Sequence, residues 1–107
     1  MSAPDTNPTQ GFKATDQQLG AAWRADELYW RDAWQSRPYV RADRGFEYYR
    51  PAYRYGFESA HRYSGQPWDE TEDQLRTSWD SYEHRGETSW HDIKEAVRDA
   101  WHRVTRR

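Results

Sequence analysis

The chain has 107 residues, a formal net charge of -2 at pH 7 and no cysteine, so it forms one domain at most and holds neither disulfides nor thiolate metal sites. The balanced charge argues against a general attraction to nucleic acid or to an anionic membrane, and no stretch approaches the roughly 20 apolar residues of a membrane-spanning helix. A charged fraction of 32% is typical of disordered chains, but seven Trp, eight Tyr and three Phe favour a folded domain.

Aromatic rings must supply most of the hydrophobic core. Only seven residues are Leu, Ile or Val, the residues that normally fill a protein interior. The cations are fourteen Arg and two Lys, and arginine stacks on rings and pairs with carboxylates in ways that lysine does not. The composition therefore predicts Trp and Tyr packing braced by arginine pairs.

Residues 1–13 are predicted to be a flexible leader, because proline, glycine, asparagine and aspartate interrupt them and little in them can be buried. Residues 14–107 then form a single helical domain. The leader does not pair a basic region with an apolar run, so we expect no secretory signal and a cytoplasmic protein.

Two short helices are predicted before the first proline of this domain. A capping box that begins at Thr15 favours a short helix through Trp23. Asp26 is the expected N-cap of a second helix over residues 27–35. This helix stops at Arg37, because the residue before a proline disfavours helical backbone.

The first main helix is predicted around residues 46–60, where five small or aromatic residues recur at helical spacing: Tyr49, Tyr53, Gly56, Phe57 and Ala60. Pro51 is compatible with this helix only in its first turn. Gly56 costs about 1 kcal/mol relative to alanine inside a helix. We therefore expect another element to approach the backbone closely at Gly56.

Two further main helices complete the predicted fold. One follows an acidic capping box at Asp69 and Glu72 and ends near Gly86, and the last follows a capping box at Ser89 and Asp92. The apolar stripes of these two helices supply the expected core: Trp68, Leu75, Trp79, Trp90, Ile93, Val97 and Trp101. The predicted fold class is all-α, a small aromatic-rich bundle of three main helices with one or two short N-terminal helices.

Charge is divided between two of these elements. Residues 69–83 hold six acidic residues against Arg76 alone, whereas residues 41–62 hold five arginines against three acidic residues. The simplest interpretation is that the acidic helix lies against the arginine-rich segment.

Three segments carry a resemblance: Ser36-Arg37-Pro38-Tyr39-Val40, Arg50-Pro51-Ala52-Tyr53-Arg54-Tyr55-Gly56 and Ala96-Val97-Arg98-Asp99-Ala100-Trp101. In this order and spacing, over residues 27–104, the chain resembles a group of short, largely uncharacterised bacterial proteins and protein tails associated with general-stress and osmotic-stress proteins. The resemblance implies a stress-related, non-enzymatic role. It carries no functional residues over to this chain.

The sequence offers little for catalysis or metal binding. His91, Glu95 and His102 can share a helix face, but a metal site needs a further ligand such as His84 or His61 and supporting contacts. A solvated polar face is the simpler interpretation, and helix capping explains the acidic residues that follow Trp68. We expect no enzyme, no metal and no cofactor, because phosphate-binding loops and nucleophile motifs are also missing from the sequence.

Association with another protein is the favoured function. Fifteen Trp and Tyr are more than a three-helix domain easily hides, and exposed rings beside arginines are typical of binding hot spots. The expected partner is a second copy or another stress protein. The residues expected to make the contact are Arg37, Tyr39, Tyr53, Arg54 and Tyr55.

The alternative is a nucleic-acid-binding module. The Tyr/Arg-rich segment 48–63 has rings that can stack on bases and arginines that can hold phosphates. The near-neutral total charge disfavours this interpretation, because tight binding to nucleic acid depends on neutralising phosphates.

Overall fold

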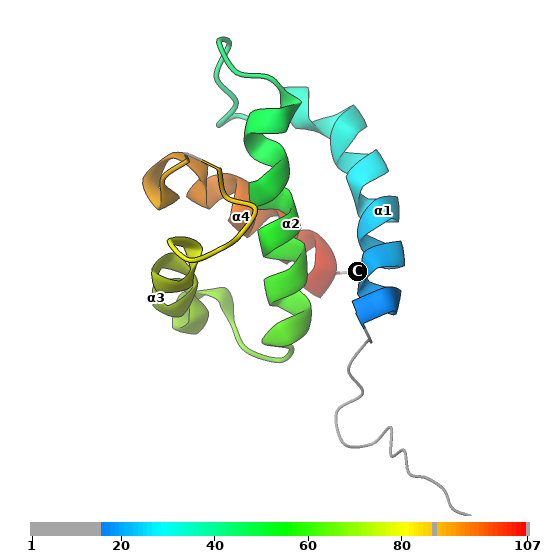
Figure 1. Ribbon diagram of the computed structural model, residues 1–107, viewed down its shortest axis with the longest axis vertical. Helices are drawn as coiled ribbons and strands as arrows, with labels where there is room; N and C mark the ends of the chain where they lie inside the picture. The colour runs from blue at the N-terminus through cyan, green and yellow to red at the C-terminus, as the bar shows by residue number, and fades with distance from the viewer. Residues whose placement is uncertain (1–15, 87, 107) are drawn as a thin grey trace, which may run out of the picture.

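The computed structural model describes residues 16–86 and 88–106, which form an all-α fold without strands (Figure 1). Its elements in chain order are α1 (Asp16–Ala33), a 3-10 turn η1 (Trp34–Ser36), α2 (Phe46–Arg62), α3 (Trp68–Trp79) and α4 (Trp90–Thr105). The predicted fold class is confirmed. The predicted leader, residues 1–13, and the capping box at Thr15 lie outside the described residues.

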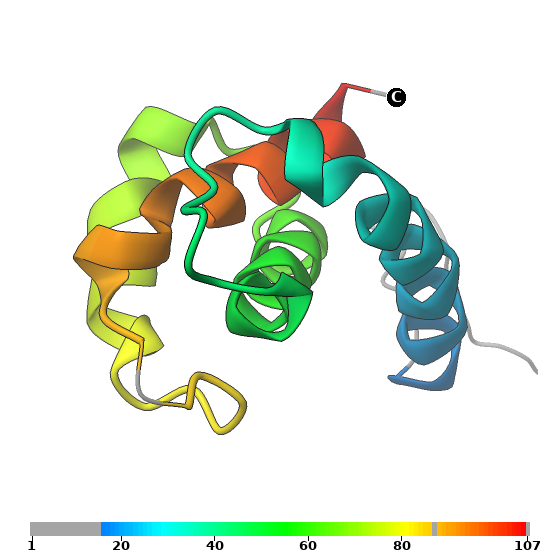
Figure 2. The same cartoon turned by 90° about the horizontal axis from the view of Figure 1, so that it is seen from above.

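Helix α2 is the centre of the arrangement. Helix α1 runs along one side of it and α3 lies on the other, while α4 crosses α2 (Figures 1 and 2). The contact between α2 and α4 is the most extensive in the fold, and α1 is joined to the rest mainly through α2. One long side of α1 therefore faces away from the molecule.

The crossing of α2 and α4 depends on Gly56. A Cβ atom at this position would overlap the carbonyl oxygen of Val97 and would lie 2.9 Å from the Cβ of Ala100. The predicted close approach is confirmed. Only a residue without a side chain lets the two backbones come this near, which offsets the conformational cost of glycine in a helix.

The predicted core is confirmed in full. All seven of its residues are buried, with exposed fractions from 0% to 8%. Rings of α1 and α2 extend this core: Trp23, Trp30, Tyr49, Tyr53, Tyr55 and Phe57. The fifteen Trp and Tyr that a three-helix domain does not easily hide are buried or half-buried except for Tyr29, and in the described residues Leu28 is the other exposed large apolar side chain. The rings cover one another through stacked and edge-to-face contacts, which the ring quadrupoles favour.

Helix α1 differs from the two short helices predicted for this region. It is one continuous helix of 18 residues, and Asp26 lies in its interior rather than at its N-cap. The Asp26 side chain is buried, with an Oδ2 atom 3.7 Å from the Nε of Arg103 on α4. The predicted N-cap is therefore wrong: Asp26 pairs with a cation of a distant helix instead of capping its own helix.

The other helix ends confirm some predictions and correct others. Ser89 is the N-cap of α4, and its Oγ accepts a hydrogen bond from the Asp92 amide. Helix α3 starts after Pro67 without a side-chain cap, so its capping box is wrong, and it ends at Trp79 rather than near residue 86. Pro51 is the sixth residue of α2 rather than in its first turn. Its missing amide removes one hydrogen bond from the helix.

The acidic helix α3 contacts the arginine-rich segment through Tyr55 of α2, but among the described residues no carboxylate of α3 pairs with an arginine of that segment. Among the ion pairs of the described residues, Arg50 of α2 reaches Glu27 of α1 at 2.6 Å, and Arg54 pairs with Glu58 within α2. Glu72 of α3 instead lies 3.4 Å from Lys94 of α4. The acidic residues of α3 remain mostly on the surface.

In the described part of the chain, no helix is both long and apolar enough to cross a membrane.

Candidate functional site

Two of the five predicted interaction residues, Arg37 and Tyr39, bind the carboxylate of Asp99 on α4, and a third, Tyr53, joins them through the Tyr39 hydroxyl. Arg37 binds the carboxylate with two donors, Nε to Oδ2 at 2.6 Å and Nη2 to Oδ1 at 3.2 Å. The Tyr39 hydroxyl donates to Oδ2 at 2.7 Å and lies 2.9 Å from the hydroxyl of Tyr53. The side chains come from the segment after η1, from α2 and from α4. The cluster therefore fastens this segment to both helices.

The electrostatics of this cluster suit a structural role. Burial raises the pKa of Tyr39, and the neighbouring Tyr53 and Asp99 raise it further, so the hydroxyl stays protonated and able to donate. Burial also raises the pKa of Tyr53. Burial lowers the pKa of the Arg37 guanidinium, but the Asp99 carboxylate outweighs this effect, and the pKa is raised overall. Each group is thus held in the protonation state that its hydrogen bonds require.

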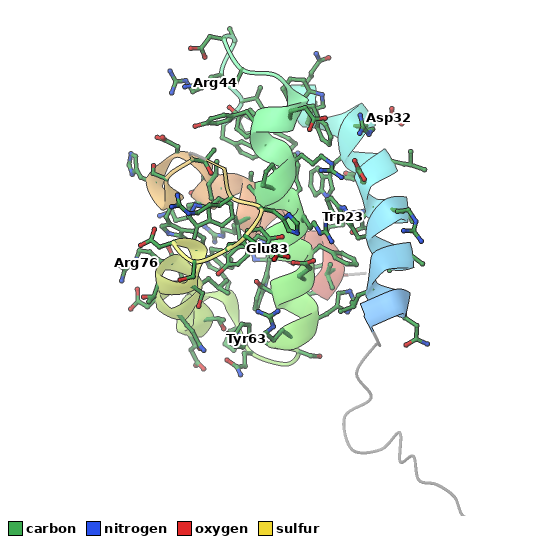
Figure 3. The ribbon with its side chains drawn as sticks, in the orientation of Figure 1. Trp23, Asp32, Arg44, Tyr63, Arg76 and Glu83 are labelled. Atoms are coloured by element: carbon green, nitrogen blue, oxygen red, sulfur yellow. The ribbon has the colours of Figure 1, made fainter. Side chains whose placement is uncertain are left out.

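The other two predicted residues, Arg54 and Tyr55, lie along a separate hollow of about 600 Å³. Its floor is α2, one wall is Trp23 of α1, and the other wall comes from the residues after α3, including Glu83 (Figure 3). The Glu58 carboxylate in this floor is engaged at both oxygens, by Arg54 Nε at 3.0 Å and by the Tyr82 hydroxyl at 3.0 Å. These contacts hold the charges to each other rather than leaving them free for a ligand.

The placement of the rings limits what the predicted residues can contact. Tyr53 is fully buried and Tyr55 is 3% exposed. The Tyr55 hydroxyl donates to the Leu75 carbonyl oxygen at 2.8 Å, which joins α2 to α3. In this conformation a partner reaches the outer parts of Arg37, Tyr39 and Arg54 but neither of these two rings. Contact by the five residues with a partner remains a prediction.

The histidines considered as metal ligands are spread over the surface. His91 and Glu95 are exposed on α4, whereas His102 is half-buried with its ring edge-to-face against Trp68. Burial lowers the pKa of His102, and Arg106 and Arg98 lower it further. In residues 16–86 and 88–106, His, Asp and Glu form no group of three or more that is arranged to hold a metal ion.

The outer face of α1 is a surface that the sequence pattern does not predict. Trp23, Asp26 and Trp30 point toward the rest of the molecule and are buried. The opposite side exposes residues at helical spacing: Ala21, Ala25, Leu28 and Asp32. Leu28 is 66% exposed. This pattern extends across Asp26, so it belongs to one continuous helix and not to the two short helices that the sequence predicts.

Charged and aromatic side chains accompany the apolar residues on this side of α1. Tyr29, which is 42% exposed, carries the guanidinium of Arg103 over its ring at 3.6 Å from the centroid. Arg24 and Asp32 are exposed, and neither has an ion-pair partner among the described residues. Asp32 lies on the outer side of α1, away from α2 (Figure 3). We define the outer face of α1 as Ala21, Arg24, Ala25, Leu28 and Asp32.

Comparison of the chain with protein-family models, curated proteins and solved structures gave no match.

Proposed function

We propose that this chain is a non-enzymatic association module of a bacterial stress response, acting in the cytoplasm, and that it associates with itself through the outer face of α1. The stress setting follows from the resemblance of its sequence segments. The observation that carries association is the exposed Leu28 side chain on a helix whose opposite side is fully packed.

The energetics of Leu28 support an interface. Burying a leucine side chain stabilises a contact by about 1.5–3 kcal/mol. The alanines beside Leu28 are exposed as well, and short side chains let a second element approach the helix backbone. Leu28 and Ala25 give the outer face of α1 an apolar centre between the charges of Arg24 and Asp32.

The rings of segment 48–63 favour association over binding to nucleic acid. Stacking on bases requires accessible faces, but Tyr49, Tyr53 and Tyr55 lie in the core. Tyr48 is half-buried under the guanidinium of Arg44, which lies 4.4 Å from its ring centroid. Stacking of bases on these four rings would therefore need a rearrangement of α2.

Native mass by light scattering after gel filtration tests the association. A single chain has a mass of 12.9 kDa, and we expect twice this value at low and at high salt, because an apolar contact survives screening. L28E should give the single-chain mass. The control Q74E adds the same charge at an exposed position of α3 and should keep the dimer mass. A native chain that stays at 12.9 kDa at high concentration would contradict self-association.

The stress assignment needs a separate measurement. We expect the transcript level of this chain to rise when cells meet osmotic shock. A level that is unchanged under osmotic, heat and oxidative challenge would remove the stress part of the proposal and leave the association untouched.

A further inference from the structure

We infer that the outer face of α1 pairs with the same face of a second copy, antiparallel, about a two-fold axis that passes beside Leu28, with Arg24 of each copy opposite Asp32 of the other. This inference rests on the proposed self-association and specifies its geometry.

The charges on this face are placed symmetrically about Leu28. Arg24 precedes it by four residues and Asp32 follows it by four, so each lies about 6 Å from Leu28 along the helix axis, in opposite directions. A two-fold axis reverses the direction of one helix relative to the other. It therefore brings Arg24 of one copy level with Asp32 of the second copy, and does so twice in each dimer.

The same charges disfavour the parallel arrangement. In a parallel, in-register pair, Arg24 would face Arg24 of the second copy and Asp32 would face Asp32. Like charges set opposite each other are repulsive and select against the wrong register. A face with opposite charges at its two ends is complementary to its own reversed copy, which is the property that an isologous interface requires.

The remaining residues of the face are compatible with this pairing. Leu28 of each copy lies at the axis, where the two side chains contact each other. Ala21 and Ala25 present only methyl groups, which permits close packing of the helices. Arg31 would stand level with Ala25 of the second copy, and its charge is already held by Glu27 of its own helix at 2.9 Å.

Cysteine cross-linking measures the axis position directly, since the chain has no cysteine of its own. We expect L28C to form a disulfide-linked dimer under mild oxidation. We expect A21C not to do so, because its two copies would be about 21 Å apart along the axis, whereas a disulfide needs Cα atoms within about 7 Å. Cross-linking of A21C as fast as L28C would overturn the antiparallel arrangement.

Charge exchange tests the ion pairs. R24E and D32R each place two like charges opposite each other, and we expect either to raise the dimer dissociation constant about tenfold at low salt. The double variant R24E/D32R restores opposite charges and should return close to the native value. An equimolar mixture of R24E and D32R should form mixed dimers. Both positions are exposed, so circular dichroism should show unchanged helix content in every variant.

The outcomes separate the two proposals. The native chain can form a dimer while the charge variants behave like it, or while L28C does not cross-link. Either result would place the interface elsewhere, which overturns this inference and leaves self-association intact. A native chain that remains a monomer would overturn both. A weaker dimer in both single variants, with recovery of the native dissociation constant in the double variant, would establish the pairing.

Discussion

The indole of Trp30 lies flat on the phenol ring of Tyr53, with ring centroids 4.3 Å apart and planes inclined by 4°. This contact joins α1 to α2, and the Tyr53 hydroxyl continues it to Tyr39. Trp30 is 2% exposed and Tyr53 is fully buried. The stack fixes the inner side of α1, which leaves the outer side presented to solvent.

Replacing Trp30 with alanine should lower the free energy of unfolding by about 3–5 kcal/mol, because the substitution removes a buried ring and leaves a cavity between two helices. Denaturant titration followed by circular dichroism measures the loss. The control is L28A, whose exposed side chain contributes little to the fold of a single chain. Equal stability of W30A and the native chain would show that the stack does not hold α1.

The substitution G56A should destabilise the protein by at least about 2 kcal/mol, even though alanine favours a helix by about 1 kcal/mol relative to glycine. The new methyl group would overlap the Val97 carbonyl oxygen and push α4 away. The matched control is G20A in α1, where an added Cβ meets nothing within 4 Å. We expect G20A to raise the melting temperature and G56A to lower it. Changes of opposite sign would confirm that α4 contacts α2 at Gly56.

Acid should weaken the attachment of α1 through Glu27. The hydrogen bond from Arg50 holds the pKa of Glu27 below its ordinary value, against the opposing effect of burial, and the bond from Arg31 lowers it further. Because the folded-state pKa is depressed, this stabilisation is present above the ordinary glutamate pKa and is lost as the pH falls through the folded-state value.

Melting temperatures of the native chain and E27Q over the acidic range measure this effect. The difference between them should be largest near neutral pH and should shrink in acid. E95Q, at an exposed position of α4, serves as the control. A difference between the native chain and E27Q that does not change with pH would contradict the role of the charge.

Alkaline titration should show four of the tyrosines ionising late. Burial raises the pKa of Tyr55 to about 12 and raises those of Tyr39, Tyr53 and Tyr82 further. Since the neutral forms are favoured in the folded state, their stabilisation is present below the ordinary tyrosine pKa and is lost as the pH rises through the folded-state values. Tyrosinate absorbance should show these rings ionising late, together with unfolding. Ionisation of these four tyrosines near pH 10, the ordinary tyrosine pKa, would contradict the effect of their burial.

The sequence by itself determined the presence of α2, α3 and α4 and most of the core. Helical spacing identified the buried stripes of α2, α3 and α4, and Ser89 was recognisable as a cap, because these features depend on residues three or four positions apart. Gly56 was recognisable as a contact point for the same reason, since glycine inside a helix has a cost that a close approach offsets.

The tertiary structure alone decided which charges and rings find partners. Asp26 has the local features of a cap, but Arg103 lies against it from α4, 77 positions away, and α1 continues through it. Arg37 and Tyr39 likewise meet Asp99 only because α4 crosses α2. Burial of a side chain depends on surfaces brought together from distant parts of the chain, so neither the burial of the surplus rings nor the exposure of the outer face of α1 was apparent from local pattern.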